Sequence, residues 1–160
     1  MKKMWMMVLT AMLAMVIAAC SGNESATVEV KESAKEIADT MVAEVEQPAQ
    51  IELSAEQLKE FYNIDAAKLE DFSVRMPMMN VKTNEIAIFK VKEAKDVAEI
   101  EAAAKQRAEN VMKQFEQYLP DQYENAKNYK IVTKDNYVLM VISESAEELI
   151  NVYDRFFEKK

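Results

Sequence analysis

The chain is most distinctive for the residue types that it almost lacks: it has no histidine, one cysteine and one glycine in 160 residues. Without histidine, and with the single cysteine assigned below to an anchor, Ser–His–Asp and Cys–His catalytic sites and soft-metal sites are excluded. The one glycine, Gly22, leaves no glycine-rich loop that could bind phosphate. The formal net charge of −8 argues against nucleic acid, whose phosphates need a basic face. We therefore expect no cofactor, no metal ion and no nucleic-acid partner.

The N-terminal segment has the pattern of an export signal. Lys2 and Lys3 precede sixteen residues that hold no charge and one polar side chain. Small residues come just before Cys20, as a cleavage site requires. The string Ile17-Ala18-Ala19-Cys20 looks like a bacterial lipobox, in which the cysteine receives a diacylglycerol thioether. We predict that residues 1–19 are a lipoprotein signal peptide and that Cys20 is lipidated.

Three alternatives explain this segment less well. A transmembrane anchor needs roughly 20 apolar residues, and no positive cluster follows the sixteen found here. A plain signal peptide would leave the cysteine unexplained, and a free thiol or an intermolecular disulfide is set aside because acylation at this position consumes the thiol. Cleavage before Cys20 removes two lysines, so the mature chain would have a net charge of −10. This charge argues against electrostatic docking on anionic lipid, so the acyl chains would attach the protein to the outer face of the cell membrane, as an extracytoplasmic protein.

Residues 20–32 are typical of a lipidated, flexible tether. The stretch SGNESATVEVKE is small, polar and acidic, and it has no helical stripe. A dozen fully extended residues reach roughly 40 Å, which would let a domain stand off the bilayer. Residues 33–160 then form a single domain, long enough to bury a core.

Four capping motifs predict where helices begin. Each has Ser or Asp followed three residues later by Glu or Gln, and apolar residues at helical spacing come after it. The motifs begin at Ser33, Ser54, Asp96 and Ser145. The longest helix follows Asp96 and ends before Pro120, because the residue before proline avoids the helical region.

Strands are predicted between these helices. Residues 72–76 alternate between apolar and polar side chains, while residues 86–89 and 138–142 are apolar on both faces, as in central strands. Residues 129–133 lead into the turn Lys134-Asp135-Asn136 of a hairpin. The predicted fold class is α+β: an antiparallel sheet of about four strands in ββαββα order, with helices packed mainly on one face and preceded by N-terminal helices.

The core is predicted to form between two of these strands and two helices. Residues 86–89 and 138–142 should pack against the helix that starts near Val97 and the helix that starts near Leu149. Phe115 lies on the apolar stripe of the long helix and should be buried.

The order of these segments resembles domain-of-unknown-function family 4358 over roughly residues 33–158. The resemblance rests on the lipobox, the acidic tether and four short strings. These strings are Tyr62-Asn63-Ile64-Asp65, Glu85-Ile86-Ala87-Ile88-Phe89-Lys90, Tyr118-Leu119-Pro120 and Tyr137-Val138-Leu139. The family often has glycine where this chain has Asn136. The resemblance implies a lipoprotein of a Gram-positive Firmicute, with no assigned activity and no catalytic residues to carry over.

One stretch is a candidate for partner contact. Met78, Met79 and Asn80 lie in or beside a predicted hairpin loop. Methionine adapts to irregular partners and is frequent on promiscuous binding surfaces. Packing of both methionines under the first helix is the more ordinary interpretation, because most apolar loop residues are partly covered.

A second group of residues has the chemistry of a calcium ligand set but not its spacing. The group consists of Asp121, Glu124, Asn125 and Asn128. It lacks the loop spacing and the turn glycine of an EF-hand, so a solvated helix surface is the favoured interpretation.

Two functions of different classes remain open. The first is a non-catalytic binding or accessory module at the cell surface, serving an unknown envelope protein or small ligand and anchored through Cys20. The second is a carboxylate-dependent hydrolase of cell-wall glycans, which needs two acids converging in a cleft and at least one pKa raised by burial.

Overall fold

The computed structural model describes residues 30–158. The predicted signal peptide, Cys20 and most of the predicted tether lie outside the described residues. Within them, no helix has both the length and the apolar composition needed to cross a bilayer. Val30 is buried against the core, so the folded domain includes a residue that the sequence placed in the tether.

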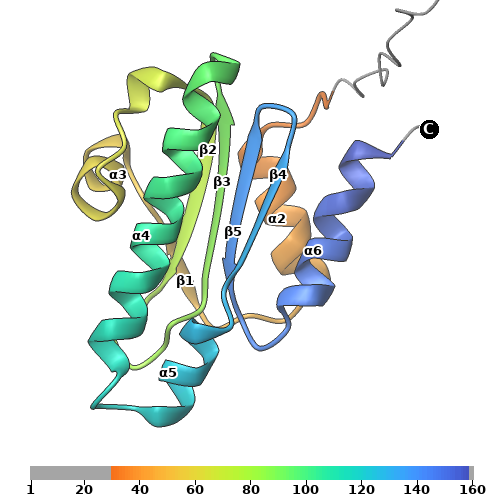
Figure 1. The fold of residues 1–160 in the computed structure, drawn as a ribbon. Helices are drawn as coiled ribbons and strands as arrows, with labels where there is room; N and C mark the ends of the chain where they lie inside the picture. Colours follow the sequence, from red (N-terminus) through yellow and green to blue (C-terminus); the bar gives the residue numbers. More distant parts are fainter. Residues whose placement is uncertain (1–29, 159–160) are drawn as a thin grey trace, which may run out of the picture.

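A five-stranded antiparallel sheet forms the centre of the domain (Figure 1). Its strands lie in the order β1-β2-β3-β5-β4. Their bounds are β1 Gln50–Glu52, β2 Leu69–Pro77, β3 Glu85–Val91, β4 Lys130–Lys134 and β5 Tyr137–Ile142. The α+β class is confirmed, and so is the ββαββα order from β2 onward, with α5 (Pro120–Lys127) as an additional helix between α4 (Val97–Phe115) and β4. The sequence predicted about four strands, and the fifth is β1. It pairs only with the last three residues of β2.

Helices cover both faces of the sheet, so the prediction of helices mainly on one face is wrong. The helices are α2 Ala34–Glu44, α3 Ala55–Tyr62, α4 Val97–Phe115, α5 Pro120–Lys127 and α6 Ala146–Asp154. Three short 3-10 helices accompany them: η2 Ala66–Lys68, η3 Ala94–Asp96 and η4 Arg155–Phe157. The helices α3, α4 and α5 pack on one face, and α2 and α6 pack on the other. The reason lies in the central strands, because β3 and β5 are apolar on both sides and each side needs a cover.

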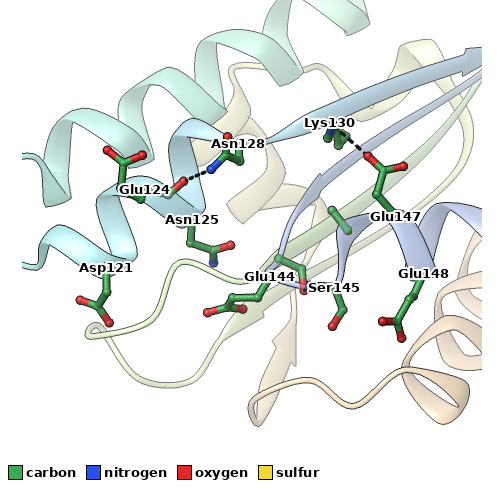
Figure 2. Close-up of a pocket in the computed structure, with 11 residues that line it drawn as sticks. Asp121, Glu124, Asn125, Asn128, Lys130, Glu144, Ser145, Glu147 and Glu148 are labelled. Carbon is green, nitrogen blue, oxygen red and sulfur yellow. Dashed lines mark hydrogen bonds and ion pairs between the residues drawn. The ribbon is translucent and has the colours of Figure 1, made fainter.

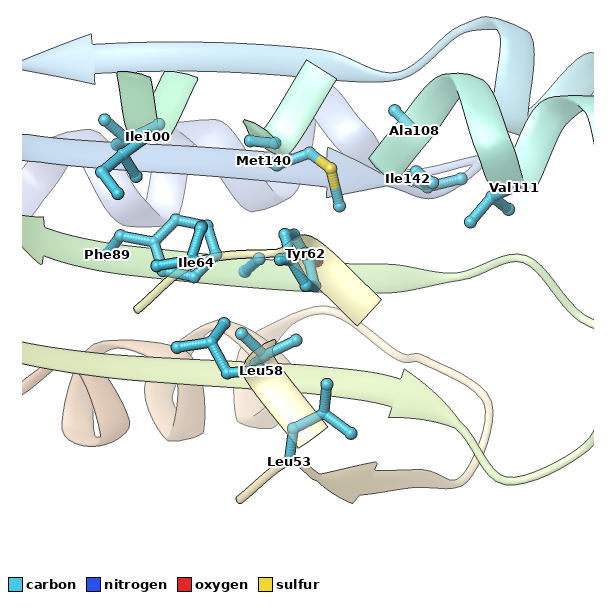
Figure 3. Packing of buried hydrophobic residues seen from close by; sticks show 14 of the residues in the cluster. Leu53, Leu58, Tyr62, Ile64, Phe89, Ile100, Ala108, Val111, Met140 and Ile142 are labelled. Atoms are coloured by element: carbon cyan, nitrogen blue, oxygen red, sulfur yellow. The ribbon is translucent and has the colours of Figure 1, made fainter. Parts of the chain in front are cut away.

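The sheet therefore separates two apolar cores. On the α4 side, Phe89 and Met140 pack with Ile100 and Leu58 (Figure 3). On the other side, Ile88 and Leu139 pack in the cluster that α2 and α6 close. The predicted core strands and helices are confirmed, although the two helices lie on opposite faces. Phe115 is 4% exposed, as predicted.

The two ends of the sheet carry different parts of the chain. The amide of Ala34 donates to Asp71 Oδ2 at 2.6 Å, so the chain enters the domain beside the start of β2. Six residues further along the same extended strand, β2 ends at Pro77, roughly 20 Å away, and the β2–β3 connection follows. The start of α5 and the β5–α6 connection lie at that second end as well (Figure 1). We call it the loop end of the domain.

Candidate functional site

The β2–β3 connection, residues 78–84, places two methionines in solvent; we call it the methionine loop. Met78 is 63% exposed and Met79 is 55% exposed, and Asn80 is exposed beside them. Packing of both methionines under the first helix, the interpretation favoured from the sequence, is therefore wrong. The amide of Met78 donates to the carbonyl of Ala49, and the amide of Lys82 donates to the carbonyl of Met79. These contacts give the loop a defined shape.

A small pocket of about 240 Å³ lies between the methionine loop and α4. Its apolar wall combines the loop methionines with side chains from β2, α3 and α4, namely Met76, Phe61, Val111 and Phe115. Glu85 and Arg107 line it as well. The pocket thus has one apolar wall, and the rest of its lining is polar: the Glu85–Arg107 ion pair, Lys82 and uncharged polar side chains.

That ion pair belongs to a buried three-residue network. Arg107 donates from Nε to Glu85 Oε1 at 3.0 Å and from Nη2 to Glu85 Oε2 at 2.8 Å. The hydroxyl of Tyr62 donates to the same carboxylate. The Arg107 guanidinium also lies 5.2 Å from the ring centroid of Phe61 and 5.8 Å from that of Tyr62. Every charge in the network is therefore paired, and Lys82 of the methionine loop is the other charged residue in the lining of the pocket.

The pKa values follow from this burial. Burial, and then the negative charge of Glu85, raise the pKa of Tyr62 well above its ordinary value. Burial alone would lower the pKa of Arg107, but hydrogen bonds to Glu85 and the charge of that carboxylate outweigh it and raise the pKa. Tyr62 stays neutral and Arg107 stays charged at neutral pH.

The two residues before Glu85 are buried and polar as well. Thr83 bonds to α5: its amide donates to Gln122 Oε1 at 3.0 Å, and Asn125 Nδ2 donates to its hydroxyl at 3.0 Å. Asn84 Nδ2 donates to Glu144 Oε2 at 2.7 Å, on the β5–α6 connection. Three consecutive residues thus fasten the end of the methionine loop to three different parts of the domain.

A second and larger hollow lies on the other side of these residues; we call it the acidic cleft. It has a volume of about 540 Å³ and lies between α5 and the start of α6 (Figure 2). Five exposed carboxylates line it: Asp121, Glu124, Glu144, Glu147 and Glu148. The four residues of the calcium hypothesis, Asp121, Glu124, Asn125 and Asn128, all line this cleft. Within residues 30–158, however, no three Asp, Glu, His or Cys side chains are grouped closely enough to bind a metal ion.

The arrangement of carboxylates does not meet the requirements of the hydrolase hypothesis. The acids of the cleft are exposed, and a hydrogen bond from the Gln122 side chain lowers the pKa of Asp121. The one buried carboxylate among residues 30–158 is Glu85, which is 1% exposed and already paired with Arg107. A general acid with a pKa raised by burial would need a carboxyl that is buried and free of such a partner.

The sequence predicted the loop but missed the network behind it. Glu85 is followed by four apolar residues of β3, and a charge in such a segment is rarely buried without a partner, so Glu85 was the available signal. Arg107 lies between Lys105 and Glu109 on α4, so the sequence did not mark it as the partner.

Comparison with known proteins identifies the family. The family model described as "Domain of unknown function (DUF4358)" matches residues 43–143. The match covers more than half of the chain, so the chain belongs to this family, as the resemblance in the sequence indicated. No curated protein and no solved structure matches the chain.

Proposed function

We propose that this member of the family is a lipid-anchored, non-catalytic binding module of the cell envelope, and that the methionine loop contacts its protein partner. The proposal is carried by one observation. Within residues 30–158, every large hydrophobic side chain that is exposed lies at the loop end of the domain. These residues are Ile51, Met78, Met79, Val81 and Tyr118. Exposed apolar side chains that gather in one region tend to mark contact sites.

The position of this surface fits an anchored protein. The chain enters the domain beside Asp71, at the opposite end of β2 from the methionine loop. If Cys20 is lipidated, the loop end is the part of the domain farthest from the point where the tether joins it. A partner in the envelope could then reach the loop without displacing the anchor.

The size of the small pocket favours a protein over a free small ligand. Pockets for drug-sized ligands usually measure roughly 300–1,000 Å³, and this one measures about 240 Å³. It suits one inserted apolar side chain. Covering what remains exposed of Met78 and Met79 would contribute about 2–3 kcal/mol to binding.

The test is photo-crosslinking of the full chain in its native membranes, with a photoreactive residue in place of Val81. We expect a discrete adduct that falls at least about tenfold when Met78 and Met79 are replaced by serine. The matched control replaces Ala98 and Ala102, two exposed residues of α4, by serine and should leave the adduct unchanged. No adduct, or an adduct of equal yield in the Met78→Ser/Met79→Ser variant, would contradict the proposal. Hydrolysis of wall fragments by the purified protein would favour the hydrolase instead.

A further inference from the structure

We propose that the small pocket binds the C-terminal residue of the protein partner, with an apolar side chain on the apolar wall and the terminal carboxylate at Arg107 and Lys82. This inference rests on the proposed function, because it takes the occupant to come from the protein that contacts the methionine loop. It adds which part of that partner binds in the pocket and what chemistry this part has.

Arg107 has a hydrogen-bond donor that its pairing with Glu85 does not use. A guanidinium carries five N–H groups, and Nε and Nη2 donate to the two oxygens of Glu85. Nη1 donates to no residue within 30–158, and it is not among the buried atoms there that lack a partner, so solvent reaches it. Because the Nε–Nη2 edge of the planar group faces Glu85, Nη1 lies on the side away from that carboxylate. Since Arg107 lines the pocket, the lining offers the N–H groups of Nη1 to an acceptor.

This donor is held in position before a ligand binds. Two hydrogen bonds fix the guanidinium on Glu85, and the ring centroids of Phe61 and Tyr62 lie 5.2 and 5.8 Å from it. A donor that is already ordered loses little side-chain entropy on binding. The Arg107 side chain is 11% exposed, so water would screen a negative acceptor at Nη1 only weakly.

Lys82 adds a positive charge to the same lining. It is exposed on the methionine loop, and it forms no ion pair with any residue from 30 to 158. A hydrogen bond from the Gln122 side chain and, at longer range, the charge of Lys82 lower the pKa of Asp121, but Lys82 and Asp121 are not in contact. The charged residues of the lining are Lys82, Arg107 and Glu85, two positive and one negative, which sum to +1 on a chain of net charge −8. A negative group is therefore the charge that complements the pocket.

The size of the pocket favours a chain terminus over an internal acidic residue. At about 240 Å³ it takes one inserted side chain, and its donors line the same hollow as its apolar wall. In an extended segment, the side chains next to the inserted one point to the opposite side, so a neighbouring carboxylate would point away from the pocket. A C-terminal residue has its carboxylate on the same Cα as its side chain. One such residue meets both the apolar wall and the donors.

Mapping of crosslinks tests which part of the partner occupies the pocket. In the full chain in its native membranes, a photoreactive residue replaces Gln114, an exposed residue of α4 that lines the pocket. The probe at Val81 reports on the methionine loop, and one at Glu56 on α3 is the control position. We expect the same protein to be joined at Gln114 and at Val81, and not at Glu56. The peptide joined at Gln114 should be the last one of the partner's chain and should end in an apolar residue.

Removal of the terminal charge gives the second measurement. The probe is a synthetic peptide with the sequence of the last eight residues of the protein joined at Val81. It is added to the membranes as a competitor, once with a free C-terminal carboxylate and once as the C-terminal amide. We expect the free acid to halve the adduct at a roughly three- to tenfold lower concentration, because the amide cannot form charge-assisted hydrogen bonds as an acceptor.

A charge variant of this chain gives an independent check. Lys82→Gln removes the exposed positive charge of the lining, so we expect a roughly two- to fivefold lower adduct yield at Val81. The same change should narrow the difference between the free and the amidated peptide, because the two groups interact. The matched control, Lys105→Gln, removes one positive charge from an exposed position of α4 outside the pocket and should change nothing. Circular dichroism should show both variants folded.

The outcomes separate the two proposals. No adduct at Val81 contradicts the proposed function itself. An adduct at Val81 combined with an internal peptide, or with no adduct, at Gln114 would overturn the inference alone. Equal competition by the free and the amidated peptide, or equal yields from the Lys82→Gln and Lys105→Gln chains, would overturn it in the same way.

Discussion

Arg107 on α4 holds both carboxylate oxygens of Glu85, the first residue of β3, through hydrogen bonds of 3.0 and 2.8 Å. The Arg107 and Glu85 side chains are 11% and 1% exposed, so water screens the pair little. This contact joins the longest helix to the strand that leaves the methionine loop, and it fixes the lining of the small pocket.

Removing one partner of this pair should destabilise the domain strongly. Arg107→Ala leaves the charge of Glu85 buried and uncompensated, so we expect a loss of about 3–5 kcal/mol in the free energy of unfolding. Urea denaturation of the purified domain measures it. The double change Arg107→Met with Glu85→Met removes both charges and should recover most of the loss. A cost below about 1 kcal/mol for Arg107→Ala would mean that the pair is not buried as described.

Two buried tyrosines should respond oppositely to the loss of their hydroxyl groups. The hydroxyl of Tyr62 donates to Glu85, whereas the hydroxyl of Tyr153 is buried without a partner among residues 30–158. Tyr62→Phe should cost about 1.5–3 kcal/mol, as hydrogen bonds to charged groups do. Tyr153→Phe should be neutral or slightly stabilising, because it removes an unsatisfied polar atom. Equal melting curves for the two variants would refute this difference.

The same tyrosines predict a loss of stability at alkaline pH. Burial raises the pKa of Tyr153, with smaller contributions from the charges of Tyr137 and Asp154, and burial also raises the pKa of Tyr62. The folded state therefore keeps these protons to higher pH than the unfolded state. Their contribution to stability is complete below about pH 10 and falls as pH rises further, by up to about 1.4 kcal/mol per pH unit for each tyrosine. Denaturation between pH 9 and 11 should show a shallower decline for Tyr153→Phe than for the natural chain.

Truncation of Phe115 should lower the free energy of unfolding more than most single substitutions. Phe115 closes the apolar core at the end of α4 and also lines the small pocket. Phe115→Ala should cost about 3–5 kcal/mol in thermal or urea unfolding. Tyr118, three residues further on, is exposed, so Tyr118→Ala should stay within about 0.5 kcal/mol. A cost below about 1 kcal/mol at Phe115 would contradict its place in the core.

The proposed lipid anchor predicts that a substitution at Cys20 changes the cell fraction in which the protein is found. Cys20→Ala removes the thiol that would be acylated, so the chain should leave the membrane fraction or accumulate as an uncleaved precursor. Fractionation and immunoblotting of the source cells measure this. Replacement of Ser21, the next residue, by alanine is the matched control and should leave the protein in the membrane. Normal processing and membrane retention of Cys20→Ala would contradict the anchor.

Local sequence signals predicted much of the secondary structure. Ser33 and Ser54 form complete capping boxes with Glu36 and Gln57. The turn predicted at Lys134-Asp135-Asn136 has Asp135 at a φ of 50°, which aspartate tolerates better than most residues. These features depend on residues close in sequence, so they could be predicted without the fold.

The two remaining capping motifs show where local signals fail. Neither Asp96 nor Ser145 makes a side-chain cap. Asp96 ends the short η3 helix that leads into α4, so its backbone is already helical. The Ser145 amide instead donates to the hydroxyl of Ser143 at 3.1 Å. In both cases the preceding segment determines the backbone, and the motif alone does not contain that information.

The arrangement of helices and the site depend on contacts distant in sequence. The central strands were predicted to be apolar on both faces, yet the helices were predicted mainly on one face, because the sequence of a helix does not specify which face of the sheet it covers. Glu85 and Arg107 are 22 residues apart, and Asn84 meets Glu144 at a separation of 60 residues. Only the folded domain brings these groups together, so the composition of one segment could not predict these contacts.

The buried run Thr83-Asn84-Glu85 also affects the thermodynamics of recognition. Because these residues are bonded to α5, to the β5–α6 connection and to α4, the methionine loop is anchored by three parts of the fold at one of its ends. A loop held in this way has little backbone entropy left to lose on association. The flexibility that remains is in the methionine side chains, which can adjust their rotamers to a partner while the backbone stays in place. We therefore expect partners of differing shape to be accommodated by side-chain rearrangement rather than by refolding of the loop.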